Sequence, residues 1–341
     1  MNKSVFLGTL AATTLLAGAV MAQGTSTLDT VKARGELNCG VNTGLVGFAA
    51  PDANGNWQGF DVAICKAVAA AVLGDASKVV YIPTTSSDRF EQLTSGKIDL
   101  LARNTTWTFS RDTDLKMDFA GVNYYDGQGF MVRKDLGVSS AKELNGATIC
   151  IQTGTTTELN LADYFKANNM TYTAVPIETN AEGEQQYLAG ACDAYTTDAS
   201  GLAATRAAFA DPENHIILPE IVSKEPLGPA VRHGDNQWGD IVMWTMNALI
   251  AAEEFGITSA NIDELATSSQ NPEVVRILGG SDDLGKMLGL DPKWAYNAIK
   301  ASGNYGEIFA ATIGESTPIG LARGLNAQWT QGGLLYTPPF R

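Results

Sequence analysis

The chain has 341 residues, of which 45% are hydrophobic and 18% charged, so it is long enough and apolar enough to form two globular domains. Its formal net charge of −14 argues against a nucleic-acid partner, because nucleic-acid-binding proteins present a basic patch. The same acidic balance argues against binding to an anionic membrane surface.

Residues 1–22 have the pattern of a secretory signal peptide. Lys3 supplies the positive start, residues 5–20 are apolar or small without a charge, and Ala22 before Gln23 suits cleavage by signal peptidase. The apolar run is short for a membrane span, and an uncleaved anchor is the alternative. We therefore expect an exported chain that begins near Gln23.

An even number of cysteines in an exported chain predicts disulfide bonds. The four cysteines, Cys39, Cys65, Cys150 and Cys192, allow three connectivities. We favour Cys39–Cys65 with Cys150–Cys192, because a bridge between the two halves would oppose their relative motion. The sequence has no CxxC motif and only two histidines, so we expect no zinc site.

The first part of the mature chain alternates strands and helices. Apolar residues at Phe60, Ile64 and Val68 recur at helical spacing. The expected elements are a helix over 28–33, a strand over 37–41, a helix over 60–73, a strand over 79–82, a helix from about 86 to 93 and a strand over 98–102. This βαβαβ order predicts an α/β fold with a parallel sheet and right-handed crossovers.

The same alternation restarts after a crossing segment at residues 124–131, which contains tyrosines and glycines. Thr155 and Glu158 stand at the spacing of a capping box, so a helix should begin there. The expected elements are strands over 147–152, 171–177 and 193–197, and helices after Thr155, around 182–188 and from Asp198 towards Phe209.

A return crossing at 225–231 is followed, from about His233, by a mainly helical region. A long apolar-rich helix is expected over 238–255. The pairs Asn271-Pro272 and Asp291-Pro292 each have the pattern of an N-cap residue followed by proline at the first helical position.

The polar stretch 103–111 follows a buried strand, and ligands of open α/β sheets bind at the carboxyl ends of strands. Arg111 offers a planar set of donors that suits a carboxylate. Asn104, Thr105 and Thr106 offer acceptors to an ammonium group. A carboxylate and an ammonium on one carbon define an α-amino acid, whereas the alternative is a solvated loop with a surface arginine.

Two features of the second half can also contact a ligand. The turn at 153–155 precedes a helix and presents free N–H groups that suit an anion, although an ordinary capped helix start is the alternative. Asp198 ends a strand and could serve an ammonium group or cap the next helix. There is no phosphate-binding glycine loop, dinucleotide fingerprint, nucleophile elbow or two-histidine metal motif. We therefore expect no cofactor, no metal and no catalytic residues.

Three motifs resemble those of the periplasmic solute-binding proteins of polar amino-acid ABC transporters. They are Gly59-Phe60-Asp61-Val62-Ala63-Ile64, Gln92-Leu93 with Gly96-Lys97-Ile98-Asp99-Leu100, and Thr106 followed by Arg111. The stretches 103–108, 152–160 and 304–308 are similar to the general L-amino-acid-binding subgroup of that family. The resemblance covers essentially the whole mature chain.

The resemblance implies a two-lobed periplasmic binding protein fold of type II, with a cleft between the lobes and a helical C-terminal extension. Lobe 1 would comprise residues 23–126 and 230–341, and lobe 2 residues 127–229. The implied function is capture of L-amino acids with broad specificity in the periplasm and delivery to permease subunits in the inner membrane. A monomer without a nucleic-acid partner is expected.

Family roles can be placed on matching residues. The resemblance implies that Arg111 holds the α-carboxylate, helped by the backbone N–H groups of Thr155 and Thr156. Asn104, Thr106 and Asp198 would hold the α-ammonium group.

Three other positions bear on the ligand. Leu45 stands where many relatives place an aromatic residue that covers the ligand. Asn42 stands where many place an acidic residue, which leaves Asp198 as the main counter-charge to the ammonium. Gln152 would face the ligand side chain in a neutral, polar pocket that suits broad acceptance.

Two other kinds of protein resemble this family and are alternatives. An exported enzyme resembling cyclohexadienyl dehydratase, acting on arogenate or prephenate, would need a catalytic carboxylate in the cleft, which Asp198 could supply. A sensor domain is the third possibility, but no transmembrane segment or signalling domain follows.

Overall fold

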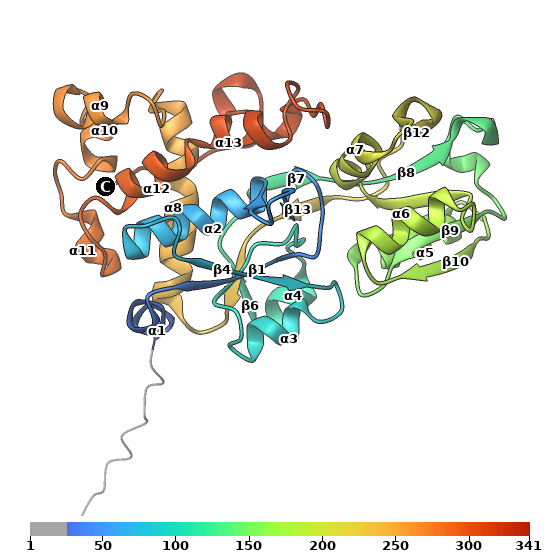
Figure 1. The fold of residues 1–341 in the computed structure, drawn as a ribbon, viewed down its shortest axis with the longest axis horizontal. Helices are drawn as coiled ribbons and strands as arrows, with labels where there is room; N and C mark the ends of the chain where they lie inside the picture. The colour runs from blue at the N-terminus through green and yellow to red at the C-terminus, as the bar shows by residue number, and fades with distance from the viewer. Residues whose placement is uncertain (1–25) are drawn as a thin grey trace, which may run out of the picture.

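The computed structural model describes residues 26–341, so the predicted signal peptide lies outside the described residues. These residues form two five-stranded sheets, each flanked by helices, and the two layers stand side by side in Figure 1. We refer to the sheet that contains the first strand, with its helices, as the first lobe, and to the other as the second lobe. Within residues 26–341, no helix has both the length and the apolar composition needed to cross a lipid bilayer.

The first lobe begins with the predicted βαβαβ unit. Its strands, in sheet order, are β4 (Val79–Thr84), β1 (Leu37–Asn42), β5 (Leu100–Leu101), β14 (Ala230–Arg232) and β6 (Met117–Phe119). Its first helices are α1 (Thr27–Arg34), α2 (Phe60–Leu73), α3 (Arg89–Thr94) and α4 (Phe109–Thr113). Strand β1 is parallel to β4 and β5, as predicted, whereas β14 is antiparallel to its neighbours. The segment before α2 forms a small hairpin of β2 (Ala50–Pro51) and β3 (Trp57–Gln58).

The second lobe repeats the pattern. Its strands, in sheet order, are β10 (Thr173–Ile177), β9 (Thr148–Gln152), β11 (Ala194–Asp198), β8 (Gln128–Arg133) and β12 (His215–Ile217). Its helices are α5 (Thr156–Ala167), α6 (Asn180–Leu188) and α7 (Ala199–Ala208). Strands β9, β10 and β11 are parallel, so their carboxyl ends lie at one edge of the sheet.

Two short strands connect the lobes. Strand β7 (Tyr124–Asp126) carries the chain out of the first lobe, and β13 (Glu225–Leu227) carries it back. They pair antiparallel with each other and lie between the two lobes in Figure 1. The chain therefore crosses twice at one place, which is the geometry of a hinge.

Both favoured disulfides are confirmed. Cys39 of β1 is bonded to Cys65 of α2, and Cys150 of β9 is bonded to Cys192 just before β11. Each bond ties a strand to a neighbouring element of the same lobe, so neither restrains one lobe against the other.

The C-terminal region is helical, as predicted, and packs on the first lobe (Figure 1). Its helices are α8 (Asn236–Glu254), α9 (Ile262–Ser268), α10 (Pro272–Ile277), α11 (Leu284–Leu288), α12 (Trp294–Ser302) and α13 (Tyr305–Thr312). Asn271 caps α10 and Pro272 occupies its first position, as predicted. The same prediction for Asp291-Pro292 is wrong. There, the Asp291 carboxylate and carbonyl accept hydrogen bonds from the N–H groups of Lys293 and Trp294, so a turn precedes the helix.

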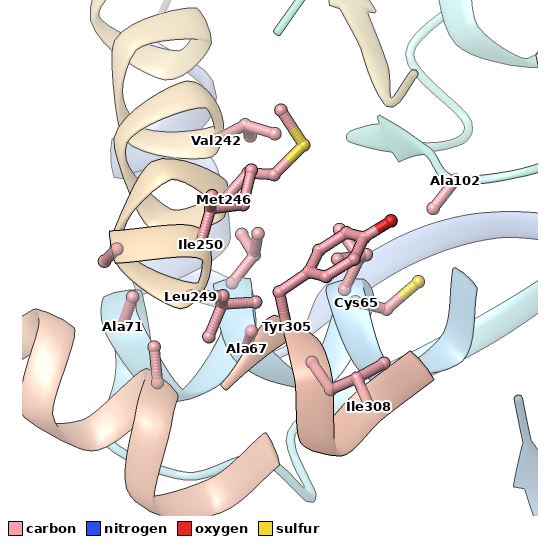
Figure 2. Packing of buried hydrophobic residues seen from close by; sticks show 14 of the residues in the cluster. Cys65, Ala67, Ala71, Ala102, Val242, Met246, Leu249, Ile250, Tyr305 and Ile308 are labelled. Atoms are coloured by element: carbon pink, nitrogen blue, oxygen red, sulfur yellow. The ribbon is translucent and has the colours of Figure 1, made fainter. Parts of the chain in front are cut away.

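Figure 2 shows how these helices share the core of the first lobe. Small side chains of α2, including Ala67 and Ala71, face Leu249 of α8 and Tyr305 of α13. Small residues let helix axes approach closely, and the larger side chains of the partners fill the space. The extension is therefore an integral part of the first lobe.

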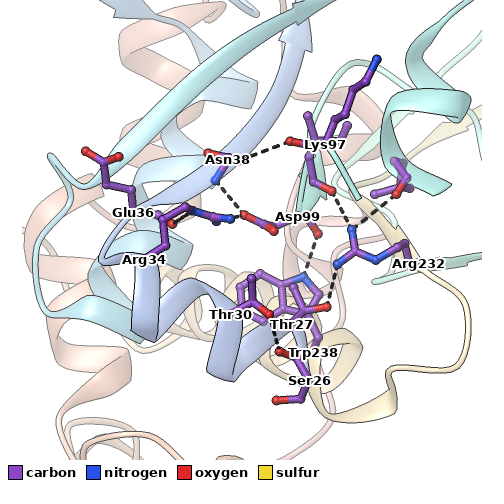
Figure 3. Close-up of polar contacts among 12 residues, drawn as sticks. Ser26, Thr27, Thr30, Arg34, Glu36, Asn38, Lys97, Asp99, Arg232 and Trp238 are labelled. Atoms are coloured by element: carbon purple, nitrogen blue, oxygen red, sulfur yellow. Dashed lines mark hydrogen bonds and ion pairs between the residues drawn. The ribbon is translucent and has the colours of Figure 1, made fainter. Parts of the chain in front are cut away.

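A polar network holds the start of β5 (Figure 3). The Asp99 carboxylate accepts the N–H of Asn38 at 2.8 Å and pairs with Arg34, and its carbonyl accepts the indole N–H of Trp238 at 2.9 Å. Arg232 donates to the carbonyl of Ile98 at 2.7 Å. These contacts fix the strand whose other end leads into the polar stretch 103–111.

Candidate ligand-binding site

The carboxyl ends of the two sheets face each other. Ser86 follows β4 in the first lobe, and its hydroxyl donates to the carbonyl of Thr153, which follows β9 in the second lobe, at 2.8 Å. The hydroxyl oxygens of Thr106, after β5, and Thr156, at the start of α5, lie 3.3 Å apart. Polar side chains at the ends of buried strands from both lobes therefore meet in one place.

Arg111 is held at this junction by a short capped helix. The hydroxyl of Thr108 accepts the Arg111 N–H at 3.3 Å and so caps α4. The guanidinium donates to the carbonyl of Thr106 at 2.9 Å and lies over the ring of Phe90, 5.0 Å from its centre. Arg111 is only 6% exposed. Burial lowers its pKa to about 10, so it remains a cation at neutral pH.

Asp198 lies at the same junction on the second lobe and is also 6% exposed. It occupies the N-cap position of α7, but its side chain makes no capping hydrogen bond, so capping does not account for it. Burial raises its pKa well above the ordinary value, and the nearby carboxylates of Asp126 and Glu225 raise it further, while Arg89 and Arg111 oppose the shift. A cation from a ligand would relieve this cost.

Asn104 is oriented by two partners in the first lobe. Its N–H donates to the Asp61 carboxylate at 3.0 Å, and its side-chain oxygen accepts from Asn42 at 3.2 Å. Asn104 has a φ of +30°, a region that asparagine tolerates better than most residues. In this structure the Asn42 side chain therefore helps to hold the Asn104 side chain in place.

Helix α5 begins at the predicted cap residue, Thr155, but the Glu158 carboxylate accepts the N–H of Gly154 and so does not complete a capping box. The hydroxyl of Thr155 accepts the N–H of Glu158 at 3.1 Å and donates to the carbonyl of Gln152 at 2.7 Å. The N–H groups at Thr155 and Thr156 stand where no intrahelical carbonyl can reach them. The Gln152 amide donates to the carbonyl of Glu178 at 2.7 Å, so its donor end is used within the second lobe.

Leu45 lies in the hydrophobic core of the first lobe, 3% exposed and in one cluster with Phe48 and Ala49. Its backbone N–H donates to the Ala49 carbonyl at 2.8 Å. The role of Leu45 in covering a ligand stays a prediction.

Sequence reasoning missed two buried arginines near the site. Arg89 of α3 is 2% exposed, lies over the Phe90 ring and reaches Thr105 only at 3.5 Å. Its Nε has no hydrogen-bond partner among residues 26–341. Arg103 is also 2% exposed, and its Nε donates to the carbonyl of Thr84 at 3.1 Å. Arg89 had only the signal of a charge at the start of a short helix, which is common on protein surfaces, whereas Arg103 opens the predicted polar stretch 103–111 but was given no role there.

Two acidic residues were also missed. Asp126 and Glu225 lie opposite each other on the paired strands β7 and β13. Burial raises the pKa of Asp126 to about 6, although Ser200 donates to its carboxylate. Glu225 is 1% exposed and accepts hydrogen bonds from side chains of both lobes. Their proximity depends on the crossing geometry, which has no local sequence pattern.

The junction therefore gathers buried charges of both signs, which can pair with a small ligand that carries both. Within residues 26–341, no cluster of three His, Cys, Asp or Glu side chains is placed to hold a metal ion.

The profile of the bacterial extracellular solute-binding proteins, family 3, matches residues 37–260. The glutamate/glutamine/aspartate/asparagine-binding protein BztA of Rhodobacter capsulatus is 68% identical over 341 residues, the full length of both chains. The general L-amino acid-binding periplasmic protein AapJ of Rhizobium johnstonii is 59% identical over the full length of both chains.

A solved structure of an ABC transporter periplasmic binding protein from Brucella ovis, with glutathione bound, superposes with a TM-score of 0.90 at 55% identity, covering 93% of this chain and 100% of that one. This likeness confirms the predicted type II periplasmic binding protein fold. Since the family profile covers more than half of the chain and full-length relatives are closely similar, the chain belongs to family 3 of the bacterial extracellular solute-binding proteins.

Proposed function

We propose that this chain is the periplasmic substrate-binding component of an ABC importer and captures L-amino acids with broad specificity for delivery to a membrane permease. Two full-length relatives are named as amino-acid-binding proteins, and neither name describes a reaction. The observation that carries the proposal is the pair of buried opposite charges, Arg111 from the first lobe and Asp198 from the second.

In the proposed complex, Arg111 binds the α-carboxylate together with the N–H groups of Thr155 and Thr156. Asp198 and Thr106 bind the α-ammonium group, helped by the side-chain oxygen of Asn104. An enclosed zwitterion loses its hydration, so each of its charges needs a buried partner.

The two charged partners come from different lobes, so the ligand is fully paired only when the lobes are closed. Ligand binding would therefore shift an open–closed equilibrium through its extra contacts with the closed form. The closed form would be the one that the permease recognises.

Arg89 supports the inclusion of acidic and amide side chains among the ligands. It is buried, and its Nε lacks a partner among the described residues. A buried donor without a partner is costly, and a carboxylate or carbonyl of the ligand would satisfy it. The name of BztA includes glutamate, glutamine, aspartate and asparagine.

The remaining assignments are also proposals. Residues 1–22 would be a signal peptide removed on export, and the mature protein would be a monomer that contacts permease subunits in the inner membrane and no nucleic acid. Lobe 1 would comprise 23–126 and 230–341, and lobe 2 127–229. The β7–β13 crossing and the return of β14 to the first sheet support these boundaries.

Calorimetric titration tests the proposal. The mature chain, stripped of ligand by unfolding and refolding, is titrated with the common L-amino acids, D-glutamate and glutathione, whose glutamyl end carries a free α-amino-acid group. We expect micromolar or tighter binding, about −8 kcal/mol or better, to several L-amino acids and much weaker binding to D-glutamate. If only glutathione binds, the ligand of this protein is a peptide and not an amino acid. If no amino acid binds and prephenate or arogenate is turned over, the protein is an enzyme and the proposal is contradicted.

A further inference from the structure

Glu225 is a buried carboxylate that accepts hydrogen bonds from four neutral side chains. Its Oε2 accepts the hydroxyls of Thr106 at 2.6 Å and Thr156 at 2.8 Å. Its Oε1 accepts the Asn160 amide at 2.7 Å and the Ser223 hydroxyl at 2.6 Å. None of the ion pairs among residues 26–341 includes Glu225. In this structure the Glu225 carboxylate is therefore hydrogen-bonded by neutral donors and not paired with a cation.

These donors come from both lobes. Thr106 follows β5 in the first lobe, whereas Thr156 and Asn160 belong to α5 in the second. Glu225 itself lies on β13, which connects the lobes. The carboxylate thus joins the two lobes at the point where the Thr106 and Thr156 hydroxyls meet.

The hydrogen bonds to Glu225 fix the direction of both threonine hydroxyls. A hydroxyl has one hydrogen and two acceptor lone pairs. A carboxylate can only accept, so the hydrogens of Thr106 and Thr156 point to Oε2. Towards any third group, each hydroxyl then presents lone pairs alone. The two oxygens, 3.3 Å apart, form a pair of acceptors backed by a negative charge.

We propose that Glu225 is a positioning residue, which orients Thr106 and Thr156 as acceptors and so selects ligands with an ammonium group. This inference rests on the proposed function, since it specifies how the ammonium end of an amino acid is recognised. A ligand ammonium offers three donors and a positive charge. A 2-hydroxy acid of the same shape offers one donor and no charge, so it gains much less from this arrangement.

The test compares L-glutamate with (S)-2-hydroxyglutarate by calorimetry in the wild type and in Glu225→Gln. Glutamine keeps the shape of the side chain but removes the negative charge, and its NH2 group donates where one carboxylate oxygen accepted. We expect Glu225→Gln to bind L-glutamate at least tenfold more weakly than the wild type does. The affinity for 2-hydroxyglutarate should change less than threefold, so the ratio of the two affinities should fall.

Thr156→Val and the double variant Thr156→Val/Glu225→Gln show whether Glu225 acts through the hydroxyl. We expect Thr156→Val alone to lower the ratio of L-glutamate affinity to 2-hydroxyglutarate affinity. The double variant should bind L-glutamate little more weakly than Glu225→Gln does, because the two residues act as one unit. Additive losses would contradict the inference. Thr156→Val also keeps it testable if Glu225→Gln does not fold.

Glu307→Gln is the matched control. The Glu307 carboxylate likewise accepts several hydrogen bonds, from Asn304 at 2.8 Å and from the Ser259 hydroxyl at 2.8 Å, but among the C-terminal helices. The Glu307→Gln variant should bind L-glutamate and 2-hydroxyglutarate with wild-type affinity. Unchanged L-glutamate affinity in Glu225→Gln, or equal weakening of both ligands, would overturn the inference alone. A wild type that binds no amino acid would overturn the proposed function and this inference with it.

Discussion

Single residues at the junction carry charges whose burial is costly. Asp198, Asp126 and Glu225 lie close enough that the last two raise the pKa of Asp198. Arg111 is the cation that the first lobe brings to the same place. In the proposed complex, Arg111 pairs with the ligand carboxylate and Asp198 with the ligand ammonium, so truncating either should leave a buried charge unpaired.

Replacement of Arg111 by alanine tests the carboxylate end. We expect L-amino-acid affinity to fall by roughly 30-fold to several-thousand-fold, or about 2–5 kcal/mol, because the ligand carboxylate would be enclosed without its cation. Calorimetry measures the loss, and circular dichroism checks the fold. Arg276→Ala, which removes ion pairs to Glu273 and Asp282 on the C-terminal helices, is the control and should keep full affinity. Near-normal L-amino-acid affinity in Arg111→Ala would show that Arg111 does not bind the ligand carboxylate.

The buried carboxyl of Asp61 gives a prediction about pH. Burial raises its pKa from 3.8 to about 7, despite the N–H of Asn104 and the charge of Arg103. A raised pKa in the folded state means that the proton is bound more tightly there. The contribution of Asp61 to stability is therefore complete below pH 3.8 and is lost as the pH rises through about 7.

Asp61→Asn keeps an acceptor for Asn104 and does not titrate. Relative to this variant, the wild type should lose free energy of unfolding between pH 5 and pH 8, by at most about 1.4 kcal/mol per pH unit. Urea unfolding at both pH values measures the difference. Parallel pH profiles for the two proteins would show that the pKa of Asp61 is not raised.

Among the elements, the C-terminal extension supports the crossing strands as well as the first-lobe core. The side chain of Asn326 accepts the N–H of Tyr125 at 2.7 Å and donates to its carbonyl at 3.1 Å, so it pairs with the backbone of β7 as a neighbouring strand would. The hydroxyl of Tyr305 donates to the Asn123 carbonyl just before β7, at 2.8 Å. The extension thus holds the first-lobe end of the hinge.

Asn326→Ala tests this support. Asn326 is 3% exposed, so the variant leaves a backbone N–H and carbonyl of β7 without partners, and we expect a loss of about 1–3 kcal/mol in the free energy of unfolding. Urea unfolding measures the loss. Asn54→Ala, in the exposed turn of the β2–β3 hairpin, should change stability little. Equal stability of both variants would mean that the extension does not brace the hinge.

The elements were the most predictable part of the molecule. The βαβαβ order, the restart after residues 124–131 and the cap at Thr155 depend on periodicity and capping within short segments, and the structure has them. The start of α12 was missed because the Asp291-Pro292 pair forms a turn of its own before the helix. Local patterns do not distinguish these two uses of proline.

Among the residues that meet at the junction, those at strand ends were the most predictable. Thr106 and Asp198 stand at strand ends, so a general rule about α/β sheets finds them. Arg89 and Glu225 belong to a helix start and a crossing strand that are 136 positions apart in number, and only the fold brings them to one junction. Long-range proximity of this kind leaves no signal in a single sequence.

At the scale of the whole molecule, the two lobes are joined by a hinge and meet at one junction. In the proposed function each lobe supplies one charged partner to the same ligand, and both disulfides lie within lobes, so neither opposes closure around that ligand. Among residues 26–341, the backbone passes from one lobe to the other only through the crossing strands β7 and β13. Ligand capture and lobe closure are then one equilibrium.

The most direct test is a crystal structure of the mature protein with the tightest-binding L-amino acid. The account predicts the α-carboxylate within about 3 Å of the Arg111 guanidinium and the α-ammonium within about 3 Å of the Asp198 carboxylate, with the lobes closed. A ligand whose α-carboxylate and α-ammonium are both held by one lobe, or by residues other than these two, would contradict it.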